Sequence, residues 1–298
     1  MQNATFWSYF RLPFSYFLVP AFMFGVVLSP NNKVAQMLWL FVILHFFIYP
    51  ASNAYHNYFN PKDDRLFSAK PPRQIYFISL FLDIMGIALA LVCFPGNYTL
   101  ALMLFAYVVA SRAYSHPIIH LKSVPILNWV IVSFFQGAWI VWMVYISLAG
   151  EGFGAVADQR VFLPGMLATL ILLATFPITQ VHHHVQDFEK ADFAISKWLG
   201  LRGTFVFAGI VYKVAAAGFS FFLKHYYSMN HAIVFMVLIS PAFMYYSWWC
   251  FKALRNKSNA SYANSLRLNL LAATCFGLFF MVLFLEESTA FELPQLVP

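Results

Sequence analysis

Two polar segments interrupt an otherwise apolar chain, and each places amides and carboxylates close together. In the first segment four such side chains recur at intervals of four, three and four residues, so on a helix they would share one face. They are Asn53, Asn57, Asn60 and Asp64. Pro61 indicates that this helix ends nearby and leaves Asp63 and Asp64 in a loop. The pattern favours either a polar binding site or a capped, solvated helix end.

The second segment follows a later apolar run and carries a polar stripe at the helical spacing i, i+3, i+4 and i+7. It consists of Gln180, His183, His184 and Asp187. A polar stripe that reaches into a membrane span is costly unless it faces a wet cavity, so the stripe favours a site. Consecutive histidines point about 100° apart on a helix, so only one of them could join Asp187 on a transition metal. Zinc is therefore the less favoured interpretation.

Basic side chains lie between the two segments. Lys70 and Arg73 flank a pair of prolines, and Arg112 and Lys122 bracket a stretch that contains Ser115. Carboxylates and amides that face arginine and lysine suit a diphosphate, whose oxygens accept from both cations and bind Mg²⁺. The alternative is a set of unpaired cations in ordinary cytoplasmic loops.

Membrane helices must position these segments, because the composition excludes a water-soluble globule. Of the 298 residues, 61% are apolar and only 10% are charged, whereas soluble domains carry roughly 25% charged residues. The net charge of +7 comes from basic residues in short gaps, which form no continuous stripe for nucleic acid. We therefore expect the lipid bilayer as a partner, no nucleic acid and no obligate protein partner.

Nine apolar runs are long enough to cross a bilayer as helices. They lie at residues 14–30, 35–58, 75–94, 98–115, 124–149, 161–186, 204–226, 232–254 and 264–286. Fourteen of the 18 Lys and Arg residues fall in connections on one side, which places the N-terminus and both polar segments in the cytoplasm. The prediction is an all-α, polytopic membrane protein with one domain over residues 1–298 and nine transmembrane helices around a central cavity. Asp83 and Lys213 lie inside runs, and we expect them to pair because an isolated ion there is costly.

At these residues the chain resembles the UbiA superfamily of intramembrane prenyltransferases. The stretch from Tyr114-Ser115-His116-Pro117 to Leu121-Lys122 is similar to the family's Tyr-Ser-x-Pro-x-x-x-Leu-Lys motif. The second segment, with Asp187 and Asp192 before Leu199-Gly200, resembles the family's second aspartate-rich motif. In the first motif, Asn53 and Asn57 stand where family members carry more acidic residues.

The resemblance implies an integral, multi-pass enzyme of a bacterial cytoplasmic membrane, with its active-site loops on the cytoplasmic side. It implies transfer of an isoprenyl group from a polyprenyl diphosphate to a lipophilic acceptor, expected to be aromatic, with Mg²⁺ as cofactor. The implied metal ligands are Asn53, Asn57, Asp63, Asp64, Asp187 and Asp192. The implied catalytic residues are Asp187, Asp192 and Tyr114, and the implied substrate-binding residues are Arg65, Lys70, Arg73, Arg112, Ser115, Lys122, Gln180, His183 and Lys190.

Aromatic faces would shield the allylic cation that forms when the diphosphate leaves. Tyr114 is the first candidate, with Tyr55 and Tyr58 nearby. Two alternatives stay open. One is a cyclase of the same superfamily, in which a double bond of the substrate captures the cation. The other, suggested by Asn53 and Asn57, is a non-catalytic protein that binds an isoprenoid or quinone.

Overall fold

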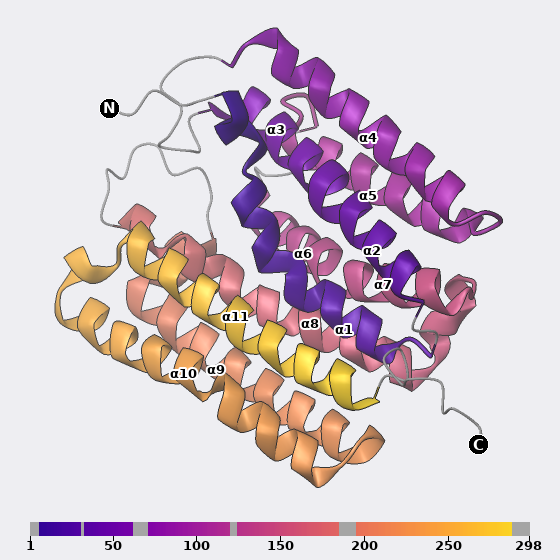
Figure 1. Cartoon of the computed structure of the whole chain (residues 1–298). Coiled ribbons are helices and arrows are strands. Elements are labelled where there is room, and N and C mark those ends of the chain that lie inside the picture. Colours follow the sequence, from indigo (N-terminus) through magenta and orange to yellow (C-terminus); the bar gives the residue numbers. More distant parts are fainter. Residues whose placement is uncertain (1–5, 31–32, 62–70, 120–123, 185–194, 288–298) are drawn as a thin grey trace.

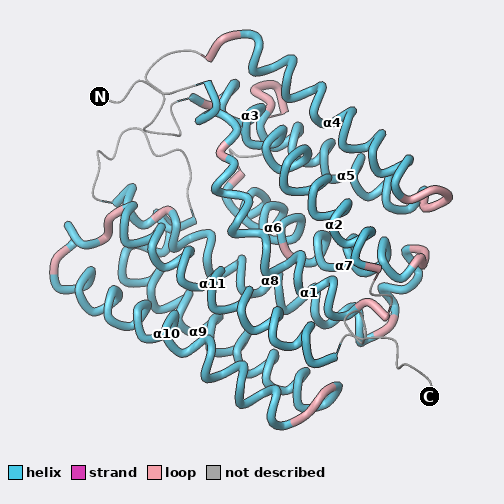
Figure 2. Tube along the Cα trace, viewed as in Figure 1, coloured by secondary structure: helices cyan, strands magenta, loops and turns pink. Residues whose placement is uncertain are grey.

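The computed structural model describes residues 6–30, 33–61, 71–119, 124–184 and 195–287 as a bundle of helices (Figure 1). Figure 2 shows these helices joined by short loops, and no strand occurs in the described ranges. The α-helices are α1 (Val19–Leu28), α2 (Val34–Val42), α3 (Tyr49–Phe59), α4 (Arg73–Cys93), α5 (Tyr98–Ser115), α6 (Pro125–Gln136), α7 (Ala138–Ala149), α8 (Gln159–Thr179), α9 (Ile195–Tyr226), α10 (Met229–Arg255) and α11 (Tyr262–Glu287). Shorter 3-10 helices are η1 (Phe6–Phe10), η2 (Leu12–Leu18), η6 (Phe153–Ala157), η7 (Val181–His184) and η8 (Lys257–Asn259), and η3 (Ile43–Ile48) is a π-helical turn.

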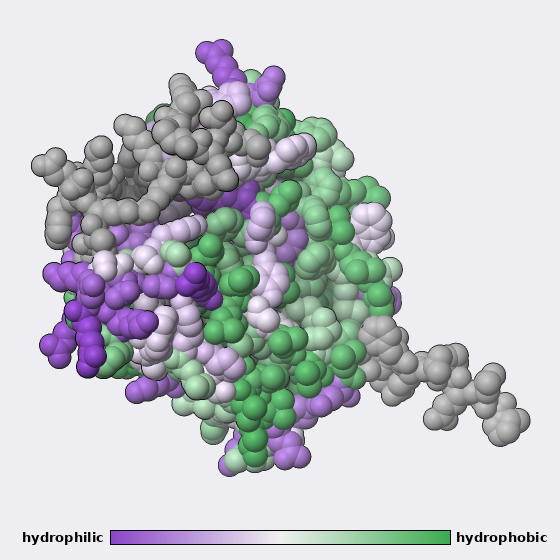
Figure 3. Space-filling view, turned by 60° about the vertical axis from the view of Figure 1, so that its left-hand side comes forward, coloured by the Kyte–Doolittle hydropathy of each residue, from purple (hydrophilic) through white to green (hydrophobic). Residues whose placement is uncertain are grey.

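These elements reproduce the nine predicted spans. Eight helical stretches of the described chain are long and apolar enough to cross a membrane. The ninth is α5, an 18-residue helix whose C-terminal end is made polar by Ser111, Arg112 and Ser115. In Figure 3 hydrophobic residues cover much of the visible flank and hydrophilic residues gather toward one side, as expected for a bundle surrounded by lipid. The prediction of a polytopic, all-α membrane protein is confirmed.

Several spans differ from the predicted runs in detail. The sixth ends earlier, at Thr179, and the seventh begins earlier, at Ile195. The first begins earlier, because 3-10 turns from Phe6 precede α1. The second contains the π turn η3 between α2 and α3. The fifth is divided into α6 and α7 at Gly137, whose backbone angles are not helical. None of these irregularities changes the number of spans, because each lies inside one continuous crossing.

Close helix packing requires glycine at one central position. Helix α1 lies against both α7 and α11. A methyl group added at Gly25 of α1 would lie 2.7 Å from Cβ of Val144 and 2.8 Å from the carbonyl oxygen of Val141, both on α7. Real side chains do not approach so closely, so Gly25 allows the backbones of α1 and α7 to meet.

A second glycine shapes α9. Gly200 has φ of +65° and non-helical angles, a conformation that favours glycine, and it bends the helix near its start. The hydroxyl of Thr204 donates to the carbonyl oxygen of Gly200 at 2.8 Å and so secures the bend. The Leu199-Gly200 pair noted in the sequence is therefore a helix kink.

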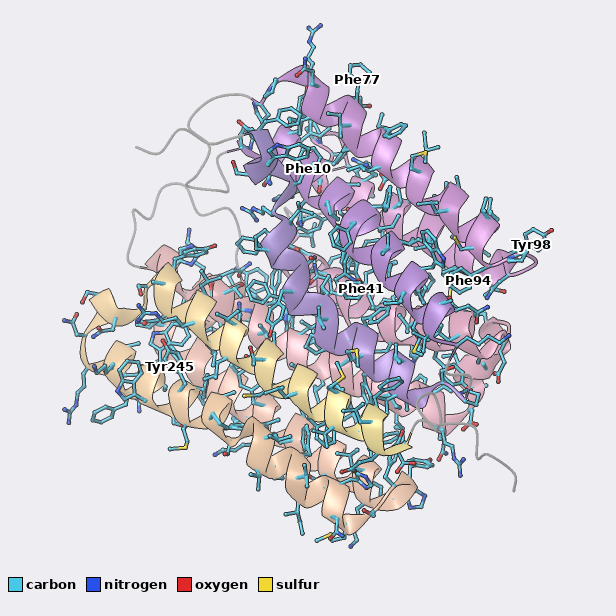
Figure 4. All side chains as sticks on the ribbon, viewed as in Figure 1. Phe10, Phe41, Phe77, Phe94, Tyr98 and Tyr245 are labelled. Carbon is cyan, nitrogen blue, oxygen red and sulfur yellow. The ribbon has the colours of Figure 1, made fainter. Side chains whose placement is uncertain are left out.

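Aromatic side chains occupy both the surface and the interior of the bundle (Figure 4). Phe77 on α4 and Tyr98 at the start of α5 point outward and are 64% and 75% exposed. Phe10 lies inside, and Phe41 stacks on the ring of His45 with 4.0 Å between ring centres. Many Phe residues thus serve as lipid-facing or packing groups, and only some line a cavity.

Candidate functional site

A cavity of about 850 Å³ extends into the bundle from the end where α3, α5 and α8 finish and α11 begins. Its lining is polar near these helix ends and mostly apolar further inside. We call the polar part the mouth. The polar side chains of the mouth are Arg11, Ser15, Ser52, Asn53, His56, Ser111, Tyr114, Ser115, Thr179, Gln180, His182, Tyr262, Ser265 and Asn269.

One wall of the mouth is a set of hydrogen bonds between α3 and α5. The hydroxyls of Ser52 and Ser111 share a hydrogen bond, and Nδ1 of His56 lies 3.2 Å from Oγ of Ser115. One turn further, the amide of Asn60 donates to the carbonyl oxygen of Ser115 at 3.0 Å. Residues 52, 56 and 60 therefore form the face of α3 that meets α5. The stripe predicted from the sequence shares only Asn60 with this face.

The structure separates the two asparagines of the first motif. Asn53 lines the cavity. Asn57 is 1% exposed and donates from Nδ2 to the carbonyl oxygen of Tyr9 at 2.8 Å, which ties α3 to η1. Its Oδ1 has no hydrogen-bond partner among the described residues. Asn57 thus faces η1, whereas Asn53 faces the mouth.

Arg112 of α5 is fully engaged outside the cavity lining. Its Nε lies 2.9 Å from Oδ2 of Asp83, and Nη2 contacts the same oxygen. Nη1 donates to the hydroxyl of Ser79, Nη2 also donates to the Ser79 carbonyl oxygen, and the guanidinium carbon lies 3.9 Å from the ring centre of Tyr55. The predicted pair between Asp83 and Lys213 is therefore wrong. Asp83 pairs with the adjacent helix α5, while Lys213 is exposed on α9.

The polar stripe predicted at the end of the sixth run is also wrong as an α-helical feature, as far as His184. Helix α8 ends at Thr179, with Pro177 in its last turn, and the N–H of Gln180 bonds to the carbonyl of Pro177 in a tighter i to i+3 turn. The chain continues as the 3-10 helix η7, where Nδ1 of His182 lies 2.8 Å from the Thr179 carbonyl oxygen. Gln180 still lines the mouth, and its buried Oε1 has no partner among the described residues.

Several predicted site residues fall outside the described part of the chain. They are Asp63, Asp64, Arg65, Lys70, Lys122, Asp187, Lys190, Asp192 and the side chain of His183. Among those that are described, Tyr114, Ser115, Asn53 and Gln180 meet at the mouth. Arg73, the first residue of α4, is exposed and does not line the cavity.

The mouth also contains an arginine that the sequence pattern does not single out. Arg11 lines the cavity between η1 and η2, with φ of 46° and ψ of 42°. This left-handed conformation is uncommon for a residue with a side chain and is often found at functional positions. Its guanidinium lies 5.2 Å from the ring centre of Phe14. The available signal was a single cation directly before a long apolar run.

Helix α11 supplies further polar groups that we did not predict. Ser265 and Asn269 lie one turn apart and both line the cavity, and Tyr262 lies above His182 with 5.4 Å between ring centres. Polar residues spaced by four within an apolar span could have indicated this face.

A sequence model described as the UbiA prenyltransferase family matches residues 17–272, so the chain belongs to that family of membrane prenyltransferases. The resemblance predicted from the motifs is confirmed. No curated protein matches the chain.

Solved structures share the fold at low sequence identity. A UbiA homologue from Aeropyrum pernix K1 aligns with a TM-score of 0.71 and 18% identity over 91% of this chain and 98% of that chain. A UbiA homologue from Archaeoglobus fulgidus bound to GPP and Mg²⁺ aligns with a TM-score of 0.64 and 13% identity, over 93% of this chain and 98% of that chain. A digeranylgeranylglyceryl phosphate synthase aligns with a TM-score of 0.60 and 13% identity, over 93% of this chain and 98% of that chain. At such identities the likeness shows the fold, an integral membrane bundle.

Proposed function

We propose that this protein transfers an isoprenyl group from an isoprenyl diphosphate to a lipophilic acceptor, expected to be aromatic. The observation that carries the proposal is a single cavity that joins a polar mouth to a long apolar interior. An isoprenyl diphosphate has the same two parts, a charged head and a hydrocarbon tail. Membership in the prenyltransferase family and a relative solved with GPP and Mg²⁺ support this match.

The diphosphate would lie at the mouth, where Arg11 and the hydroxyl of Ser115 can donate to its oxygens. The described residues end beside this mouth at Pro61 and again at His184. The aspartates of the two polar segments follow these positions in the sequence. We propose that Lys70, Lys122 and Lys190 add positive charge there, while Arg112 acts through its contacts with α4. Arg65, Gln180 and His183 are further candidates for the head group, whereas Arg73 is exposed outside the cavity lining.

Oxygen ligands at the mouth fit Mg²⁺. Asn53 offers an amide oxygen and Gln180 has an amide oxygen without a partner among the described residues. We propose that Asp63, Asp64, Asp187 and Asp192 supply the carboxylates, and that Asn53 is a better ligand than the inward-turned Asn57. When bound, Mg²⁺ would neutralise charge on the diphosphate and so favour its departure.

The reaction would begin when the allylic C–O bond breaks and the diphosphate leaves with the electron pair. Tyr114 lines the mouth and would present its ring to the cation. Tyr55 does not line the cavity and already faces the guanidinium of Arg112, so it is unsuited to this role. The acceptor would then form a carbon bond to the cation and lose a proton, while the apolar walls keep water away from the cation.

We further propose that the mouth faces the cytoplasm of a bacterial cell. The support is the excess of Lys and Arg in the connections on that side of the bundle. Accessibility of single introduced cysteines to a membrane-impermeant thiol reagent would test the orientation.

Diphosphate release tests the proposed activity. Membranes containing the full chain should release diphosphate from geranyl diphosphate in a Mg²⁺-dependent manner, and Asp187→Ala should abolish release. Asp158→Asn is a matched control, because Asp158 caps the opposite end of α8 and does not line the cavity. Absence of release and transfer over a panel of prenyl chain lengths would contradict the proposal.

Asn53 and Asn57 support a second candidate, a non-catalytic protein that binds an isoprenoid or quinone, because amides attract Mg²⁺ less than carboxylates do. It would bind prenyl compounds without Mg²⁺ and without turnover. A cyclase would instead release diphosphate in the absence of any acceptor. Measuring diphosphate release with and without an added acceptor therefore distinguishes the three candidate functions.

A further inference from the structure

Three phenylalanine rings line the inner end of the cavity. Phe24 of α1, Phe219 of α9 and Phe280 of α11 all line it and are each at most 2% exposed. Phe24 stacks on Phe280 with 4.4 Å between ring centres, and Phe219 lies 5.4 Å from Phe24 and 6.4 Å from Phe280. We call this group the phenylalanine floor.

The floor lies far from the mouth. On α11 the lining begins with Tyr262 at the mouth and ends with Phe280, a rise of roughly 27 Å for an α-helix. Phe24 and Phe219 are likewise the innermost lining residues of α1 and α9. A tail that starts at the mouth therefore meets the floor only after most of the span.

A second layer of rings supports the floor from behind. Phe222 lies 6.1 Å from Phe24, Phe235 lies 5.2 Å from Phe219, and Phe279 lies 5.4 Å from Phe280 between ring centres. None of the three lines the cavity. A floor ring cannot simply swing outward, because the space behind it is filled.

We propose that the phenylalanine floor sets the longest prenyl chain that the protein accepts. The inference rests on the proposed function, since it assigns the cavity interior to the prenyl tail. A tail that fills the cavity packs against the three rings. A longer tail must displace rings that are backed by a second packed layer, and overpacking of this kind weakens binding roughly five- to hundredfold.

A chain-length series tests the floor. The full chain in lipid nanodiscs would be titrated in Mg²⁺ with prenyl diphosphates that increase by one isoprene unit at a time, from geranyl to solanesyl, and its thermal midpoint followed. For the wild type we expect one chain length above which every longer prenyl diphosphate binds at least fivefold more weakly. We call this length the cutoff. Phe280→Ala should move this cutoff upward by at least one isoprene unit. Phe205→Ala is the matched control, because Phe205 is 1% exposed on α9 but does not line the cavity.

Each outcome decides the inference. Affinity that does not fall at any length up to solanesyl diphosphate in the wild type would overturn it, since the tail would then leave the cavity between helices. An unchanged cutoff in Phe280→Ala would also overturn it, and Phe24→Leu repeats the test with a smaller loss of volume if the alanine variant does not fold.

A parallel series with the corresponding prenyl alcohols separates the floor from the proposed function. A length cutoff for alcohols without any diphosphate binding would support the floor and contradict prenyl diphosphate as substrate. Failure to bind any prenyl alcohol or diphosphate would overturn both.

Discussion

Arg112 and Asp83 form an ion pair between α5 and α4, well shielded from solvent, with Ser79 and the ring of Tyr55 as further partners of the guanidinium. The pair joins three helices, because Tyr55 belongs to α3. Two of these helices carry the Ser52, His56 and Ser115 wall of the mouth. The same contacts thus neutralise the Asp83 carboxylate inside the bundle and hold α3 and α5 in place at the mouth.

Removing one partner of this pair should be more harmful than removing both. Asp83→Ala leaves the Arg112 guanidinium without its counter-ion and should destabilise the fold by about 3 kcal/mol. The double variant with Arg112→Met should recover much of that loss, because no unpaired ion remains. Thermal unfolding in nanodiscs measures both. Strictly additive losses would show that the two charges do not act as a pair.

Aspartate should have opposite effects at the two asparagines of the first motif. Asn53→Asp adds a carboxylate at the mouth and should strengthen Mg²⁺-dependent ligand binding with little change in stability. Asn57→Asp removes the donor to the Tyr9 carbonyl at a buried position and should cost about 2 kcal/mol. Titration with Mg²⁺ and thermal unfolding of the two variants provide the comparison. Equal effects at both positions would argue against the orientations described for α3.

Replacing Arg11 by glycine should weaken ligand binding without lowering the stability of the fold, because the backbone at Arg11 is in a left-handed conformation. Arg11→Gly relieves the left-handed conformation, which costs roughly 1–2 kcal/mol for a residue with a side chain, so stability should not fall. Loss of a charged donor should weaken binding of geranyl diphosphate about tenfold or more. Isothermal titration with the diphosphate and with geraniol checks this. Weaker binding of geraniol as well would indicate a general distortion of the cavity.

A small substitution at the contact between α1 and α7 should be costly. Gly25→Ala would bring a methyl group within 2.8 Å of Val144 and Val141 and should destabilise the fold by about 1–3 kcal/mol. Gly152→Ala is the matched control, since a methyl group there has nothing within 4 Å. Comparable unfolding midpoints for the two variants would mean that α1 can shift away from α7 at little cost.

The number and order of the spans were predictable, because bilayer thickness sets the length of an apolar run and basic residues mark its ends. Contacts between helices were not. Periodicity could not show that Asp83 meets Arg112 of α5 and not Lys213 of α9, because it describes one helix at a time. The end of α8 at Thr179 was missed because we extended a regular helix past Pro177.

The sequence predicted several residues of the candidate site, but not how they are arranged in space. Tyr114, Ser115 and Gln180 were found because a local motif marks them. Arg11 was missed because its importance comes from a backbone conformation that no spacing rule reveals.

The π turn η3 lies one step before the polar end of the second span. A π turn accommodates one residue more than the regular helix would, which rotates everything after it by about 100° about the axis. Deleting a single residue from Ile43–Ile48 would thus yield a more regular helix in which Ser52 and His56 no longer point at α5. The irregular turn therefore sets the rotation of this end of the helix. One insertion or deletion within it would change which side chains face α5 without replacing any residue that lines the mouth.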